Sequence, residues 1–284
     1  AGSVEMATTL DVTGKDCLWP SNMVAVELAR SAGRRVLGDE TIFNSPIVFY
    51  AWDEVAEALE RAGAVRQQAG TWTANVDAIG ALITEGARWQ EDLGVAVYGP
   101  FRVLSTHPAK SNSGNIWAGL LATVFNDGAT PTEDDLQSLL PRIEAYFAAQ
   151  GHMESSSGDI FENFLKQGMG ARPIIVGYEN QMVEFLIENA EFADLIRERI
   201  RVIYPEPTIF ASHPLIALTD TCDRLEEALT DAELQDIAWA SHGFRTGLIG
   251  VENDPGQIKV ATLPETVGLV APMPTAKVMQ AVID

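Results

Sequence analysis

The feature that most constrains the fold is the alternation of short apolar segments with longer segments of helical periodicity. Strand-like runs lie at residues 47–50, 101–104, 173–176 and 200–204. Helix-like segments lie at residues 53–62, 75–93, 114–125 and 180–189. This alternation is typical of α/β proteins with mainly parallel sheets. In such folds ligands bind near the carboxyl ends of strands and the starts of helices.

The composition indicates a large globular chain with a strongly acidic surface. The 284 residues are 46% hydrophobic, which is enough for one large or two medium-sized lobes. There are 40 Asp and Glu residues against 19 Lys and Arg, which gives a net charge of −21. This charge disfavours binding to nucleic acid or to an anionic membrane surface. No apolar run approaches the roughly 18 residues of a membrane span.

The first residues and the two cysteines bear on localisation. The chain shows no recognisable export signal. Ala1-Gly2-Ser3 resembles a cloning remnant, so we expect an export or anchor segment to have been trimmed ahead of it. Cys17 and Cys222 leave two alternatives: a disulfide, which suits an exported protein, or two buried free thiols.

The segment at residues 105–119, STHPAKSNSGNIWAG, predicts a turn that opens a helix. His107 and Pro108 form the turn, and Ser111, Ser113 and Gly114 precede an apolar helical pattern. Free backbone N–H groups at a helix start, together with nearby hydroxyls, can cradle a small ligand or anion. The alternative interpretation is an ordinary serine N-cap.

Other strand ends and loops carry polar groups of the same kind. Tyr178, Glu179 and Asn180 follow the strand at residues 173–176 and could fix a polar ligand, although Asn180 could instead cap the next helix. Ser21 enters a helix and could cap it or face a ligand. Ser45 opens the strand at residues 47–50, where a plain turn is the alternative.

The sequence shows no recognisable catalytic or metal-binding motif. It contains no G-x-S-x-G elbow, phosphate-binding loop, G-x-G-x-x-G or C-x-x-C motif. His107 and His213 each precede a proline, and with Glu179 they would form a metal site only if the fold brought them together. We favour turn roles for both histidines. Because the sequence also lacks catalytic and cofactor motifs, we expect no enzyme activity, no resident metal and no cofactor.

Six short motifs, in order, resemble those of bacterial extracellular solute-binding proteins. They are Asn44-Ser45-Pro46-Ile47-Val48, AWDEVAEAL at residues 51–59, the turn at residues 101–114, Tyr178-Glu179-Asn180, RVIYPEPTIFASHP at residues 201–214, and Gly243-Phe244-Arg245. The resemblance covers about residues 9–275. It is closest to the type II periplasmic-binding-protein fold, in the branch near molybdate-type binders and von Willebrand A-linked binding domains.

This resemblance implies two α/β lobes joined by crossing strands. Lobe one would comprise residues 1–101 plus 203–284 and lobe two residues 102–202, with a hinge near Phe101 and Tyr204. The chain departs from the family in two ways. Little of the strand, ligand-contacting Ser loop and helix with which the family begins is present ahead of Trp19, so we expect either that the sequence begins inside lobe one or that this is an unusual member. His107 also replaces the more usual Asp before Pro.

The resemblance further implies capture of a small polar or anionic solute between the lobes, for an ABC importer outside the cytoplasm, by a monomer. The ligand-binding residues would be Ser105, Thr106, His107, Ser111, Ser113, Gly114, Tyr178, Glu179, Asn180, Ser21 and Ser45. The alternative is a cell-surface or sensor domain of the same fold that binds a protein partner or a metal. An enzyme is the third hypothesis, and it lacks an identifiable nucleophile or acid pair.

Overall fold

The computed structural model describes residues 2–258 and 263–283, and it has the mixed α/β architecture that the sequence predicts. The helices are α1 (Ser3–Thr8), α2 (Val24–Ser31), α3 (Asp53–Arg61), α4 (Val76–Thr84), α5 (Asn112–Phe125), α6 (Leu136–Ala148), α7 (Ser157–Gln167), α8 (Glu179–Glu188), α9 (Ala193–Arg199), α10 (Asp223–Leu229), α11 (Ala232–His242) and α12 (Ala276–Ile283). The strands are β1 (Cys17–Leu18), β2 (Gly38–Trp52), β3 (Val65–Gln68), β4 (Thr71–Asn75), β5 (Ile174–Tyr178), β6 (Ile200–Glu206), β7 (Phe210–Ala217) and β8 (Arg245–Thr246). Short 3₁₀ turns lie at Glu133–Asp135, Ala190–Phe192, Asp220–Cys222 and Pro255–Gln257.

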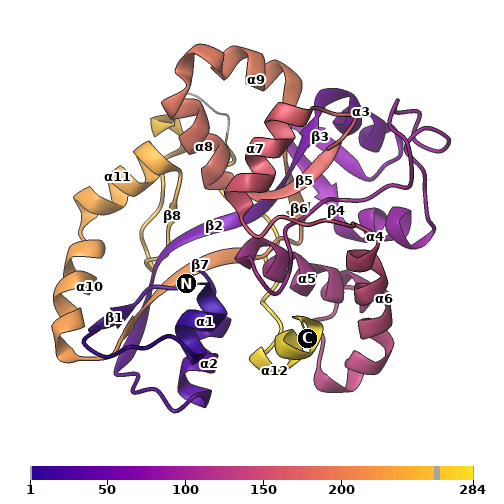
Figure 1. Cartoon of the computed structure of the whole chain (residues 1–284). Coiled ribbons are helices and arrows are strands. Elements are labelled where there is room, and N and C mark those ends of the chain that lie inside the picture. Colours follow the sequence, from indigo (N-terminus) through magenta and orange to yellow (C-terminus); the bar gives the residue numbers. More distant parts are fainter. Residues whose placement is uncertain (1, 259–262, 284) are drawn as a thin grey trace.

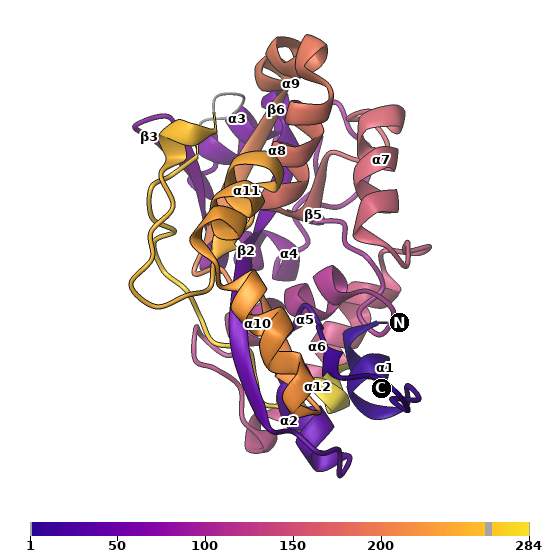
Figure 2. The same cartoon turned by 90° about the vertical axis from the view of Figure 1, so that its left-hand side faces the viewer.

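Strand β2 runs through the length of the molecule and joins two sheet regions (Figures 1 and 2). Its residues 38–46 pair with β7 and, in part, with β8, and β1 extends this first sheet region beyond β7. Its residues 47–52 pair with β5 and β6, and β4 and β3 extend this second sheet region. Residues 46–51 of β2 are buried on both faces, as their β-branched and aromatic side chains favour.

The expectation of mainly parallel pairing is wrong. Among the pairings of named strands in the described residues, only β4 with β6 is parallel. The reason lies in β2, which runs opposite to β5, β6 and β7 and lies between β5 and β6. Strands that share one direction are therefore separated by a strand of the other direction. The alternation of strands and helices cannot reveal such an insertion.

Helices cover both faces of each sheet region. Helices α3, α4, α5 and α6 pack on one face of the second region, and α7, α8 and α9 pack on the other. Helices α1 and α2 cover one face of the first region, while α10 and α11 cover the opposite face. Helix α12 returns against α5, α6 and α2. No helix in the described part of the chain is long and apolar enough to cross a membrane.

The two sheet regions meet where β2 passes from Pro46 to Ile47 and where Pro207 separates β6 from β7. Tyr204 lies on β6 shortly before this point, whereas Phe101 lies outside the named strands. Strands β3 and β4 share the second region with β5 and β6, although residue 101 lies between the two pairs in sequence. The predicted lobe boundaries at 101/102 and 202/203 stay a prediction.

Candidate functional site

The start of α5 has a geometry that a simple serine cap does not explain. Ser111 is the N-cap residue, but its side chain makes no cap hydrogen bond. Its Oγ lies 3.2 Å from Ser113 Oγ, which lies 2.7 Å from Thr106 Oγ1. A Cβ at Gly114 would lie 2.2 Å from the Thr106 carbonyl oxygen, so only glycine permits this close packing. The hydroxyls therefore gather against the 105–107 loop.

His107 and Ser105 hold that loop in place. The His107 N–H donates to the Glu154 carbonyl (2.9 Å), and its Nδ1 accepts from the Ala109 N–H (3.1 Å). Burial lowers the pKa of His107, and Lys110 lowers it further, so the imidazole is neutral near pH 7. Buried Ser105 donates through Oγ to the Thr106 carbonyl (3.2 Å).

Three asparagines that the sequence analysis missed tie α5 to other elements. Asn112 Nδ2 donates to the Ser21 carbonyl (2.7 Å) and to Tyr178 Oη (3.2 Å). Asn22 Nδ2 donates to Asn112 Oδ1 (3.0 Å) and Asn115 Oδ1 (3.1 Å). The spacing of Asn112 and Asn115 was the available signal, because residues three apart share one face of a helix.

These residues form one hydrogen-bonded cluster, which we call the α5 network. Ser21 joins it through its backbone carbonyl, and a hydrogen bond between Ser113 and Tyr178 links the hydroxyls to the asparagines. Its members are Ser21, Asn22, Thr106, Ser111, Asn112, Ser113, Asn115 and Tyr178. Burial raises the pKa of Tyr178 well above its ordinary value, so the phenol stays neutral. Every member is thus uncharged near neutral pH. A cavity of about 300 Å³ lies beside the network, lined by residues 2–5, residues 108–112 and Asn115.

Ser45 and Asn180 form a separate pair where β2 passes between the sheet regions. Ser45 Oγ donates to Asn180 Oδ1 (2.8 Å) and accepts from the Asn180 N–H (3.3 Å). Tyr178, not Asn180, is the N-cap residue of α8, so the cap interpretation of Asn180 is wrong. The pair joins the crossing strand to the start of α8.

Glu179 lies in a buried ion pair rather than in the α5 network. Arg245 donates through Nε to Glu179 Oε1 (2.7 Å) and through Nη2 to Oε2 (2.9 Å). Tyr204 Oη also donates to Glu179 Oε2 (2.6 Å), and Arg245 donates to the carbonyls of Pro264 and Glu265. The carboxylate is therefore compensated inside the protein, and it joins α8 to β8.

The histidines do not form a metal site within the described residues, where no cluster of three or more His, Cys, Asp or Glu side chains is suitably placed. His213 lies on β7 and packs against Phe244, with ring centroids 5.2 Å apart. Its buried Nδ1 has no hydrogen-bond partner among the described residues. Burial lowers the pKa of His213 to about 4, so it is neutral at pH 7.

Comparisons with known proteins identify the fold. No protein-family model and no curated protein matches the sequence. Among solved structures, the sulfate-binding protein SubI from Mycobacterium tuberculosis H37Rv is similar, with a TM-score of 0.53, 15% identity, and coverage of 98% of this chain and 81% of that one. A ferric binding protein from Campylobacter jejuni has a TM-score of 0.58 and 9% identity, covering 99% and 83%. The Pasteurella haemolytica apo ferric ion-binding protein A has a TM-score of 0.57 and 11% identity, covering 94% and 80%.

These matches define the class of fold. The chain has the two-lobed architecture of the periplasmic substrate-binding proteins, which confirms the type of fold that the sequence motifs predict. Identities this low support a shared fold alone. The placement near molybdate-type binders and von Willebrand A-linked domains stays a prediction.

Proposed function

We propose that this chain is a solute-binding protein that captures a small polar or anionic solute without turning it over. The supporting observation is convergence: the starts of α5 and α2 and the end of β5 contribute to the α5 network beside a 300 Å³ cavity. Backbone N–H groups at the start of α5, with neutral amides and hydroxyls, can bind an anion without a counter-charge. Ser105, His107 and Gly114 would shape this site, and Ser45 and Asn180 would set the angle of α8.

Solute capture in a two-lobed protein requires movement of the lobes. The resemblance to solute-binding proteins predicts a hinge near Phe101 and Tyr204. We add the passage of β2 from Pro46 to Ile47 and the facing Pro207, because the chain passes there from one sheet region to the other. The α5 network connects the two sheet regions. Ser21 and Asn22 precede α2, which packs on the first region, and they bond to Asn112 at the start of α5, which packs on the second. A bound solute would therefore act on the closure of the two regions.

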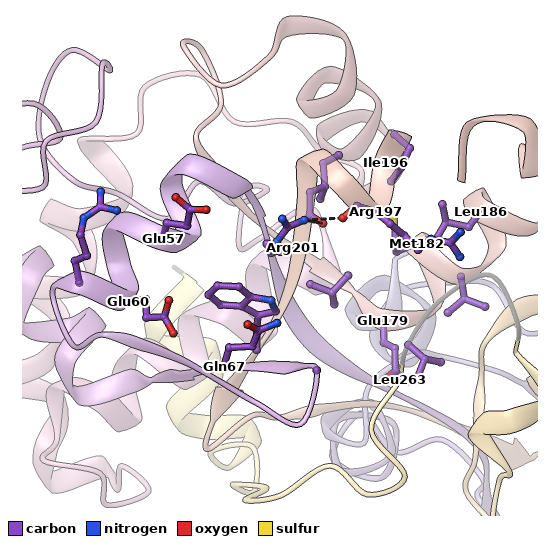
Figure 3. Close-up of a pocket in the computed structure, with 16 residues that line it drawn as sticks. Glu57, Glu60, Gln67, Glu179, Met182, Leu186, Ile196, Arg197, Arg201 and Leu263 are labelled. Carbon is purple, nitrogen blue, oxygen red and sulfur yellow. Dashed lines mark hydrogen bonds between the residues drawn. The ribbon is translucent and has the colours of Figure 1, made fainter. Parts of the chain in front are cut away.

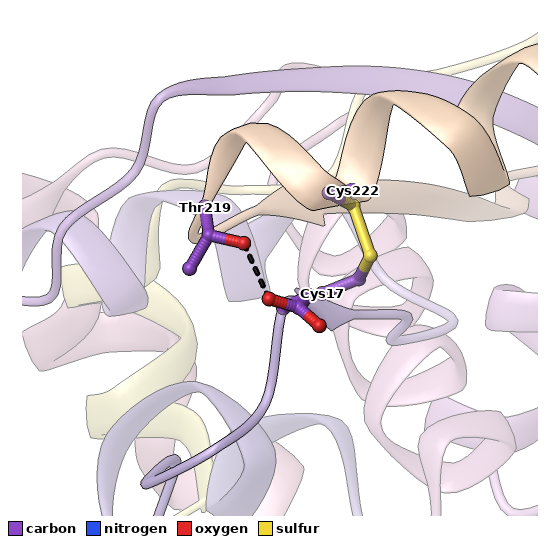
Figure 4. The surroundings of a disulfide bond; sticks show 4 residues. Cys17, Thr219 and Cys222 are labelled. Atoms are coloured by element: carbon purple, nitrogen blue, oxygen red, sulfur yellow. Dashed lines mark hydrogen bonds between the residues drawn. A yellow bond between two sulfur atoms is a disulfide. The ribbon is translucent and has the colours of Figure 1, made fainter.

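The cysteine pair supports an extracytoplasmic location. Cys17 on β1 and Cys222 form a disulfide, with Cα atoms 5.5 Å apart and a sequence separation of 205 residues (Figure 4). Thr219 donates to the Asp16 side chain beside it. Disulfides persist in oxidising compartments. We propose that the protein works outside the cytoplasm as a monomer and delivers its solute to an ABC permease.

One observation favours the alternative, a cell-surface or sensor domain. The α5 network is already satisfied internally, because Asn112 bonds both to Ser21 and to Tyr178. A solute would have to replace these bonds. A domain whose two regions stay joined would instead present a fixed surface to a protein partner.

A thermal-shift screen against oxyanions, carboxylates, amino acids and sugars tests solute capture. A solute at a hundredfold its Kd adds about 2.7 kcal/mol of stability, which corresponds to a few degrees. We expect one class to raise the Tm, and the double change Asn112→Ala with Ser113→Ala to abolish that rise.

Asn189→Ala is the matched control, because among the described residues the Asn189 side chain bonds only to the Phe185 carbonyl of its own helix (2.9 Å). This variant should keep the full shift. A shift of full size in the Asn112/Ser113 variant would place the solute elsewhere. The absence of a shift with every class would favour the sensor alternative.

A further inference from the structure

A second cavity, of about 620 Å³, lies outside the α5 network at an edge of the second sheet region. We call it the β6 cavity. Its walls come from α3, the β3–β4 hairpin, α8, α9 and β6, together with Leu263 (Figure 3). It opens there because β4 pairs with β6 only from Ile203 onward, which leaves residues 200–202 without a described partner on that side.

One half of the β6 cavity is apolar. Met182 and Leu186 of α8 and Ile196 of α9 line it, and Figure 3 shows all three on the same side of Arg201. Ile200 and Val202 of β6 complete this wall. Met182 and Leu186 also belong to the core packed between α8 and β6, so the wall is held by the fold. An apolar tail placed here would be removed from water.

Arg201 lies in the middle of the β6 cavity. Its Nη1 donates to the carbonyls of Arg197 (2.6 Å) and Ile200 (3.3 Å), which fix the guanidinium. Its Nε and Nη2 have no acceptor among the described residues. Two parallel N–H donors of one guanidinium match the two oxygens of a carboxylate. A half-buried arginine with its fork uncommitted is thus complementary to a carboxylate group.

The remaining charges of the lining limit the charge of the ligand. Glu179 is paired with Arg245, and Arg197 with Asp194. This leaves Glu57, Glu60, Arg61 and Arg201, two negative and two positive groups. Figure 3 places Glu57 and Glu60 on the side of Arg201 opposite the apolar wall. A lining without net charge, in which two carboxylates share the cavity with the cations, disfavours sulfate, phosphate and other multiply charged anions.

We propose that the β6 cavity binds a small organic monocarboxylate with an apolar tail. The carboxylate accepts two hydrogen bonds from Arg201, and the tail packs on Met182, Leu186 and Ile196. This site is separate from the solute-binding role assigned to the α5 network and does not depend on it.

Titration calorimetry of the whole chain with three probes tests the proposal. Octanoate carries both features, acetate carries the carboxylate alone, and 1-octanol carries the tail alone. We expect saturable binding of octanoate, with acetate and octanol each binding roughly tenfold more weakly or worse. Equal binding of octanol would show that Arg201 has no role, and no octanoate binding at millimolar concentration would overturn the site.

Arg201→Gln should raise the Kd of octanoate roughly tenfold or more, because the charged hydrogen bonds are lost. Arg199→Gln is the matched control, since Arg199 is exposed, lies outside the cavity lining and makes the same change in net charge. Ile196→Asp offers a second variant at a half-buried position and should likewise raise the Kd of octanoate roughly tenfold or more, because it places a charge on the apolar wall. Unchanged affinity in either cavity variant, with a retained Tm, would overturn the proposal.

Discussion

The α5 network and the β6 cavity differ in how their polar groups are satisfied. In the network, Asn112 and Asn22 bond to partners inside the protein, and every group is neutral. In the cavity, Arg201 is charged and keeps two nitrogens without a described acceptor. A site that satisfies itself must exchange partners to bind, so its binding is coupled to motion. A site with free donors can bind without rearrangement.

Glu179 connects the α5 network with the β6 cavity. It follows Tyr178 of the network directly in sequence and also lines the β6 cavity. Its ion pair with Arg245 compensates the Glu179 carboxylate, so neither the network nor the cavity faces an unpaired negative charge from this residue. The contrast between a neutral network and a cavity that contains the uncommitted donors of Arg201 therefore depends on this buried pair.

Breaking this pair gives the largest expected effect. Glu179→Gln leaves Arg245 as a buried, uncompensated cation and should cost about 3–5 kcal/mol of unfolding free energy, measured by urea denaturation. Glu184→Gln is the control, because its partner is the exposed His242 and the cost should stay within about 1 kcal/mol. Equal costs for the two variants would mean that burial does not set the strength of the Glu179 pair.

The second prediction concerns the pH dependence of folding stability. The neutral α5 network should contribute nothing to it, whereas His213 should. His213 has a pKa of about 4 in the folded protein, below the ordinary value of 6.5. The unfolded chain therefore binds more protons between these values, and stability should fall as the pH drops from about 6.5 to 4. The loss is of order 3 kcal/mol.

His213→Phe keeps an aromatic ring against Phe244 and should flatten this part of the stability curve. Denaturant midpoints measured between pH 4 and 7 would show the difference. His152→Phe, at an exposed position, should follow the unmodified chain. If His213→Phe keeps the full pH dependence, another group controls it.

The smallest expected effect on stability comes from a substitution within the α5 network. Tyr178→Phe removes the hydrogen bonds that the phenol makes with Asn112 and Ser113. Asn112 keeps its bond to the Ser21 carbonyl, and the change should cost about 1–2 kcal/mol. It should weaken solute binding at the α5 network and leave octanoate binding in the β6 cavity unchanged. Tyr98→Phe is the control, because Tyr98 is 90% exposed. A change in octanoate affinity would show that the two sites are coupled.

The sequence alone determined the class of fold and several local features. Alternating strand and helix patterns indicated an α/β protein, and the short motifs indicated the two-lobed binding-protein fold. The serines around residue 111 and the polar group at Tyr178 were found because strand ends and helix starts leave recognisable local patterns. These features depend on residues close in the chain, so periodicity and turn chemistry reveal them.

Tertiary structure decided what depends on distant residues. Only the folded chain placed β2 between β5 and β6, which both run opposite to it. It also paired Glu179 with Arg245 and brought Asn22 to Asn112 and Asn115. It likewise joined Cys17 to Cys222, an alternative that spacing left open. The physical reason is that a hydrogen bond or ion pair between distant segments leaves no periodic trace in sequence. The partners of each polar group, and hence which sites are satisfied and which are free, follow only from packing.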